Sequence, residues 1–335
     1  MIDINKMRHA VLILAHNKPE QIRKLVDSLD GGCFDFYIHV DGKRDLAPFR
    51  SQFRKNRENI HLIGDDIRVN VYLNDFSLVD ATCILLQEAY SKGEYVYYIL
   101  LTGQDYPIKS NGYIKNFLDA NYPTMFIDSY GIEEGKKNGI KWVDSVGRSQ
   151  FSQKMRRNIL NMVGRRMYYS SYGKIFKIIP RLYDLIMTER HGVPYDIIKN
   201  NTEYTYSVGS HFWMLPDVAV SHILEVYEHD SFINDIFRHT AAPEESYFQT
   251  VLTTMDRDVP IPDPWSQFAS MEAEMDNPAR RLIKWYENGI HTSGHPSIWK
   301  KTDFEFIERA KALFARKFDK DVDNEIIEMI DTRLR

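Results

Sequence analysis

The sequence predicts an α/β fold: a mostly parallel, Rossmann-like central sheet flanked by helices, in one large domain spanning residues 1–335. The first half of the chain shows two patterns typical of such folds. Strand-like apolar runs lack polar alternation, and helical segments lie between them. The 335 residues, 43% of them hydrophobic and 27% charged, suffice for one large core or two adjacent ones.

Strands and helices alternate in the first half. The apolar run 10–15 predicts a strand buried on both faces. Pro19 then opens a helix, and the glycine pair 31–32 ends it. The other elements predicted here are strands at 34–40, 60–64, 95–101 and 123–128, and a helix at 76–92. In the less regular second half we predict a strand at 206–215 and helices at 217–228, 243–254, 303–318 and 323–334.

The composition argues against secreted and membrane-spanning proteins. Two cysteines, Cys33 and Cys83, are too few for a disulfide framework and favour a reducing compartment. The N-terminal residues resemble neither a signal peptide nor a membrane span, and no other segment is long and apolar enough to cross a bilayer. We therefore expect a cytoplasmic protein.

A basic segment lies between Lys136 and Arg190. It holds thirteen lysines and arginines against three acids, a net charge of +10 in a chain whose net charge is -4. Such a charge can attract an anionic membrane surface, a lipid phosphate or a nucleic acid. A solvated basic face is an equally good explanation. We expect residues 135–200 to form a partly helical insert.

Polar side chains follow three of the predicted strands. His16 follows the strand 10–15, Asp41 follows 34–40, and Asp105 lies just after 95–101. Ligands of open α/β sheets bind beyond the carboxyl ends of the strands, so this pattern predicts a crevice for a nucleotide-sized ligand. Taken alone, the polar residues after any one strand can be explained as residues that favour a turn. Neither GxGxxG nor GxxxxGK[ST] is present, which argues against dinucleotide-binding enzymes and P-loop ATPases.

The sequence predicts no protein-held metal ion. TGQDYP at 102–107 has a single acid where metal-dependent sugar-nucleotide transferases carry Asp-x-Asp. The alternating acids at 319–323 resemble a calcium loop, but Asn324 and Ile330 stand where that loop needs Gly and Glu. An enzyme that expels a diphosphate without a metal must neutralise it with arginine or lysine.

The segment PEESYFQTVL at 243–252 places two acids, Glu244 and Glu245, at the start of a predicted helix. Acids at this position stabilise a helix by about 0.3–1 kcal/mol, and the stretch alone favours this explanation. The alternative is that one acid is a catalytic base. A helical wheel places Glu244 closer to the centre of the apolar face than Glu245.

Seven segments show a family resemblance in their order along the chain. They are LILAHNKPEQIRKLVDSL, YIHVDGK, FSLVDATCILLQEA, YYILLTGQDYPIKS, GSHFWML, PEESYFQTVL and LFARKFD. Together they resemble the core-2/I-branching glycosyltransferases (glycosyltransferase family 14), which include β-1,6-N-acetylglucosaminyltransferases and protein xylosyltransferases. The matches run from about Val11 to Asp319, and LTGQDYPIKS and PEESYFQT are the most specific.

The resemblance implies a GT-A fold and an inverting reaction of a UDP-sugar that needs no metal cofactor. Glu245 matches the acid of the family's Pro-Asp-Glu motif, which selects it over Glu244 as the catalytic base. The resemblance places Arg281 and Lys317 at the donor diphosphate, and His16 and Asp41 near the nucleoside. Asp105, which follows the strand 95–101, is the third predicted nucleotide-binding residue. Residues 1–130 would then form the nucleotide-sugar-binding half and 201–335 the acceptor and catalytic half.

The expected reaction transfers N-acetylglucosamine, xylose or another hexose to a hydroxyl group of a glycan or lipid-linked oligosaccharide. We expect a role in bacterial capsule or lipopolysaccharide synthesis, with peripheral membrane contact through 136–190 and no nucleic acid partner. VYLNDFS replaces a Trp-Gly common in the family, which leaves the donor sugar open. The alternatives are a catalytically silent glycan- or nucleotide-binding scaffold of a polysaccharide assembly complex and a metal-using nucleotidyltransferase.

Overall fold

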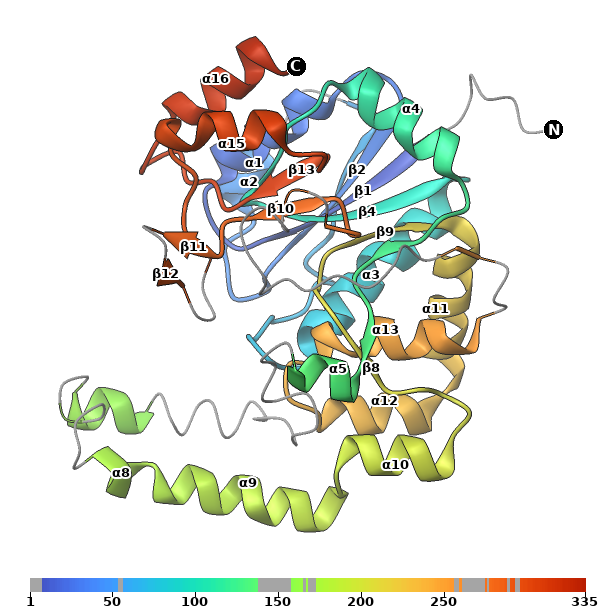
Figure 1. Cartoon of the computed structure of the whole chain (residues 1–335), viewed down its shortest axis with the longest axis vertical. Coiled ribbons are helices and arrows are strands. Elements are labelled where there is room, and N and C mark those ends of the chain that lie inside the picture. Colours follow the sequence, from blue (N-terminus) through green and yellow to red (C-terminus); the bar gives the residue numbers. More distant parts are fainter. Residues whose placement is uncertain are drawn as a thin grey trace.

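The computed structural model describes residues 8–53, 57–137, 158–164, 167, 173–255, 259–260, 275, 277–287, 290–292 and 296–335. Its central sheet has six strands in the order β3-β2-β1-β4-β9-β6 (Figure 1). The strands are β1 (His9–Ala15), β2 (Phe34–Val40), β3 (Ile60–Leu62), β4 (Tyr97–Thr102), β6 (Phe126–Ile127) and β9 (Trp213–Pro216). Strand β9 runs antiparallel to both neighbours, and the other strands run parallel to one another. The predicted mostly parallel sheet is therefore confirmed.

The continuous apolar runs arise because helices cover both faces of the sheet. Alternate residues of β1 enter two separate cores: Leu12 packs into one and Ile13 into the other. The first core includes side chains of α3 (Ser77–Lys92), α11 (Asp217–His229), α12 (Ser231–Arg238) and α13 (Tyr247–Val251). The second includes side chains of α1 (Pro19–Leu29), α2 (Ala47–Gln52), α4 (Asn111–Asn121), α15 (Phe304–Arg309) and α16 (Glu325–Arg333).

Three small sheets complete the described fold. One has the order β10-β13-β5, formed by β10 (Arg281–Ile283), β13 (Phe314–Arg316) and β5 (Asp105–Pro107). The others pair β7 (Tyr130–Gly131) with β8 (Ser207–Val208), and β11 (Tyr286–Glu287) with β12 (Ile290–His291). The predicted helix 303–318 is therefore wrong beyond Arg309. Residues 312–315 are buried and extend into β13, which pairs with β10 on one side and β5 on the other.

Two further predictions in the second half are corrected. The predicted single strand 206–215 is two strands in different sheets, β8 and β9, separated by residues 209–212. A Cβ atom at Gly209 would lie 1.7 Å from the carbonyl oxygen of Asp128, so only glycine allows this close approach. The predicted helix 243–254 is broken at Ser246 into the 3₁₀ turns η2 (Pro243–Glu245) and η3 (Leu252–Thr254) on either side of α13.

The basic segment contributes helices that leave the body of the molecule. After α5 (Ile132–Lys137), α8 (Gly173–Phe176) and α9 (Ile178–His191) project outward, and α10 (Pro194–Asn201) returns to pack on α12 (Figure 1). Seven of its thirteen basic residues lie outside the described residues: Lys141, Arg148, Lys154, Arg156, Arg157, Arg165 and Arg166. In the described part of the chain, no helix has both the length and the apolar character needed to span a bilayer.

Candidate active site

The carboxyl edge of the central sheet brings the predicted polar residues together. Strands β1, β2, β4 and β6 run in the same direction, so His16, Asp41, Thr102 and Asp128 lie at or just beyond the same edge. The antiparallel strand β9 begins at this edge and adds His211, which precedes it by two residues. The candidate site therefore runs along one edge from β2 to β6.

His16 and Asp41 form the β2 end of this edge. The carboxylate of Asp41 accepts hydrogen bonds from the backbone N–H groups of Lys43 and Val71, both at 3.1 Å, and pairs with Lys43 Nζ at 3.0 Å. Burial opposes ionisation, but these bonds outweigh it and lower the pKa of Asp41. The pKa of His16 is lowered, first by desolvation and then by the charge of Arg44, with Asp41 opposing.

Asp105 and Arg281 form a buried ion pair beside the end of β4. Arg281 Nη1 lies 2.8 Å from Asp105 Oδ1, and Nη2 donates to the Leu100 carbonyl at 2.9 Å. The other carboxylate oxygen of Asp105 accepts from the backbone and hydroxyl of Thr102. Asp105 and Arg281 are each only 1% exposed. Both carboxylate oxygens of Asp105, a predicted nucleotide-binding residue, therefore accept hydrogen bonds from the protein itself. Arg281 Nε has no hydrogen-bond partner among the described residues.

Arg316 and Lys317 are partly exposed, and Arg316 lies next to this pair. Arg316 Nη1 donates to Thr102 Oγ1 at 2.7 Å and lies 3.6 Å from Asp105 Oδ2, and its guanidinium covers the ring of Phe212 at 4.6 Å. Burial lowers the pKa of Lys317, and the charge of Arg316 lowers it further. Two cations, Arg281 and Arg316, thus share a single buried carboxylate, and Lys317 follows Arg316 in the chain. The two arginines leave an excess of positive charge suited to an anionic ligand.

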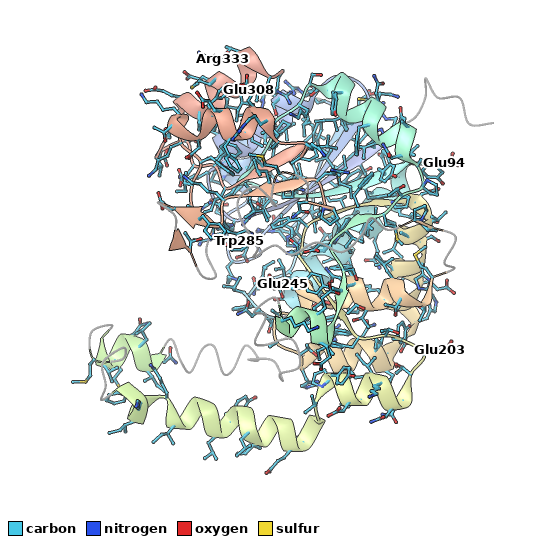
Figure 2. All side chains as sticks on the ribbon, viewed as in Figure 1. Glu94, Glu203, Glu245, Trp285, Glu308 and Arg333 are labelled. Carbon is cyan, nitrogen blue, oxygen red and sulfur yellow. The ribbon has the colours of Figure 1, made fainter. Side chains whose placement is uncertain are left out.

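Glu244 and Glu245 lie at the β6 end, in the 3₁₀ turn η2 rather than in the first turn of an α-helix. Burial raises the pKa of Glu244 to about 8, with the charge of Glu245 contributing, and burial raises that of Glu245 to about 7. A helix N-terminus would lower these pKa values, so burial is the larger influence on both acids. Glu244 is buried, and Glu245, which is labelled in Figure 2, is partly exposed.

Asp128 is a second acid at this end that sequence reasoning missed. Burial raises its pKa to about 7, the backbone N–H of Ser210 at 3.4 Å opposes this, and the charge of Glu245 raises it further. The backbone of Gly209 joins the two acids locally, because its N–H donates to the Glu245 carbonyl at 2.9 Å. Asp128 is the last residue of the predicted strand 123–128 but directly follows the observed strand β6, so the strand-end rule finds it only once the strand is known to end at Ile127.

The arrangement can support two kinds of chemistry. Arg281, Arg316 and Lys317 can neutralise a diphosphate, and an acid with a pKa near 7 can accept a proton at neutral pH. His211 lies beside the cations with a pKa lowered to about 3 by burial and then by Arg316, so its imidazole is neutral. Within the described residues no three His, Cys, Asp or Glu side chains form a group that could hold a metal ion. Metal independence remains a prediction.

Comparisons with known proteins match nearly the whole chain. The family model "Branch: Core-2/I-Branching enzyme" matches residues 10–308. Xylosyltransferase 2 of Homo sapiens is 20% identical over 354 residues, and Xylosyltransferase 2 of Mus musculus is 21% identical over 354 residues. These alignments cover 98% of this chain and 34% of each relative. The chain therefore spans about a third of the length of the curated relatives it matches.

Proposed function

Because the chain belongs to the Core-2/I-branching enzymes, a family of glycosyltransferases, we propose that it transfers a sugar from a UDP-sugar to a glycan hydroxyl group. The observation that carries this proposal is the division of the sheet edge into two ends. Cations gather beside β4, and carboxyl groups with raised pKa values gather beside β6. A donor diphosphate at the first end would point its sugar toward the second.

In the proposed reaction, Glu245 accepts the proton of the acceptor hydroxyl. The acceptor oxygen then attacks the anomeric carbon from the face opposite the diphosphate, and the bond between that carbon and the diphosphate oxygen breaks. The configuration at the anomeric carbon is inverted. A pKa of about 7 suits this role, because a general base works best when its pKa lies near the working pH.

The leaving diphosphate needs charge stabilisation, which we assign to the cations beside β4. Lys317 and Arg316 are partly exposed and can contact the phosphate oxygens directly. Arg281 is only 1% exposed, so it would act on the diphosphate through its charge rather than by direct contact. Asp105 positions Arg281, and His16 and Asp41 bind the nucleoside. No metal ion takes part in this proposal.

For the substrates we propose a donor carrying xylose, N-acetylglucosamine or another hexose. The curated relatives named xylosyltransferases support the first of these, although they share only 20–21% of the aligned residues. The proposed acceptor is a growing surface glycan, in the synthesis of a bacterial capsule or lipopolysaccharide.

Calorimetric titration with UDP in excess EDTA, followed by transfer assays with UDP-sugars, tests the function. Wild-type protein should bind UDP without a metal ion, and Glu245→Gln should bind UDP within twofold of wild type. Transfer by Glu245→Gln should fall by about 10²–10⁴-fold, the usual contribution of a general base. Glu244→Gln is the matched control and should retain transfer.

Each part of the proposal has an outcome that contradicts it. Binding of UDP only with magnesium or manganese would contradict the metal-free role of Arg281, Arg316 and Lys317. Near wild-type transfer by Glu245→Gln would exclude Glu245 as the base. UDP binding without transfer of any sugar would instead indicate a silent nucleotide-binding scaffold.

A further inference from the structure

Helix α9 carries a row of exposed aliphatic side chains that the proposed reaction does not use. Ile178, Leu182, Leu185 and Ile186 are 56%, 54%, 55% and 51% exposed. Their spacing places them within about 100° of one another on the helix surface. Soluble proteins seldom expose adjacent large aliphatic side chains without a partner for them, so this row marks a binding surface.

The setting of the row indicates the chemistry of its partner. Helices α8 and α9 project from the body of the molecule (Figure 1), so they extend a surface away from the central sheet. Lys177 directly precedes α9, and Arg190 is exposed in its last turn. The whole segment between Lys136 and Arg190 has a net charge of +10. Apolar side chains flanked by basic residues are typical of helices that lie in the interface of an anionic bilayer.

We propose that the row Ile178, Leu182, Leu185 and Ile186 docks the protein on an anionic membrane surface. The aliphatic side chains enter the boundary between headgroups and acyl chains, and the basic residues meet the lipid phosphates. A second copy of the chain is a poorer occupant, because pairing of two rows would bring two segments of net charge +10 together. The same charge attracts anionic lipid.

The segment that carries α8 and α9 is connected to the candidate site through the β7–β8 pair. The segment from α5 to α10 lies in the chain between β7 and β8, which pair with Tyr130 opposite Val208. Tyr130 follows Asp128 by two residues, and Val208 precedes Gly209, whose N–H is bonded to Glu245. The β7–β8 pair thus links the projecting segment to the acid end of the site. If the proposed function holds, its acceptor is carried on a membrane lipid.

Vesicle co-sedimentation of the full chain tests the docking without requiring transfer. Wild type should bind phosphatidylcholine vesicles with about 30% phosphatidylglycerol at least tenfold more tightly than pure phosphatidylcholine vesicles. Leu182→Glu/Leu185→Glu should lose at least tenfold of the binding to the anionic vesicles. The matched control is Val218→Glu/Tyr113→Glu, which changes side chains 40% and 51% exposed on the body and should bind like wild type.

UDP titration of the same proteins separates this inference from the proposed function. If only the α9 variant loses vesicle binding and it keeps its affinity for UDP, the docking is supported. If the wild-type protein binds vesicles but not UDP, the docking is supported and the transferase function is not. Equal binding of wild type and the α9 variant would overturn the docking. A lack of preference for anionic vesicles would also overturn it, as would sedimentation velocity showing dimers that only the α9 variant dissociates.

Discussion

At the residue scale, the two acids Asp128 and Glu245 share one feature that bears directly on the proposed chemistry. Both have a pKa raised to about 7, and the charge of Glu245 contributes to the shift at Asp128. Repulsion between two carboxylates is mutual, so the pair favours a state in which one proton remains. The protein therefore keeps one carboxylate available as a base near neutral pH.

The pH dependence of transfer follows from this pair. Glu245, whose pKa is about 7, is ionised above pH 7. The rate of transfer should therefore rise with pH to a plateau, and at pH 6 it should be about a tenth of the plateau rate. Burial is the main cause of the raised pKa of Glu245, but the interaction with Asp128 is mutual, so we expect Asp128→Asn to lower the pKa of Glu245 as well. The midpoint of the rise in a pH–rate profile should therefore fall by about 0.5–1 pH unit.

The control for this prediction is Glu134→Gln. Glu134 interacts with Asp128, and Asp128 interacts directly with Glu245, whereas no interaction between Glu134 and Glu245 contributes to either shift. Its profile should match that of wild type. An unchanged midpoint in Asp128→Asn, or a midpoint moved to higher pH, would show that Asp128 does not influence the base.

At the element scale, the three-stranded sheet β10-β13-β5 positions the cations. Arg281 comes from β10, Arg316 from β13 and Asp105 from β5, so the buried pair joins the two outer strands of this sheet. The pair is also tied to the central sheet, because Arg281 donates to Leu100 in β4. A change in this pair should therefore affect the stability of the fold as well as the site.

Asp105→Asn tests this structural role. Removal of one charge leaves Arg281 buried and unpaired, and the free energy of unfolding should fall by about 3–5 kcal/mol in a urea titration. Glu325→Gln is the control: it breaks the exposed pair with Lys301, at 2.8 Å, and should cost less than about 1 kcal/mol. Wild-type stability in Asp105→Asn, combined with weaker UDP binding, would instead support direct contact of Asp105 with the nucleotide.

The elements also show where sequence reasoning succeeds. Predictions for β1, α1, β2 and α3 hold because long apolar runs, a proline start and helical spacing are local signals. Residues 310–316 fail because alanine and arginine favour a helix locally, whereas pairing with β10 and β5, distant in sequence, stabilises a strand. The same limit applies to Arg316. Its neighbour Lys317 was selected by a motif, but only the sheet shows that Arg316 lies beside Asp105.

The acids at 244 and 245 show what the sequence could and could not resolve at the site. The helical wheel correctly placed Glu244 on the more buried side, although the helix itself is broken at Ser246. The raised pKa values result from burial by segments distant in sequence, so no local pattern could reveal them. The roles assigned to Glu245, Lys317, His16 and Asp41 remain predictions.

At the scale of the whole molecule, the candidate site separates donor binding from proton transfer. Strand β6 lies two strands from β4, about 10 Å across the sheet. The pKa of Lys317 responds to Arg316, Asp319 and Lys18, whereas that of Asp128 responds to Glu245 and Glu134. Groups so separated should contribute independently to UDP affinity.

This separation predicts the behaviour of Lys317→Ala alone and combined with Glu245→Gln. Loss of one charge-assisted phosphate contact should weaken UDP binding by about 10–100-fold in a calorimetric titration, and the double variant should have the same UDP affinity as Lys317→Ala. Lys301→Ala, which removes an exposed lysine paired with Glu325, is the control and should bind UDP like wild type. Unchanged UDP affinity in Lys317→Ala would remove Lys317 from the diphosphate site.

A further loss of UDP affinity in the double variant would mean that the acid end also holds the nucleotide. The edge of the central sheet would then act as one site.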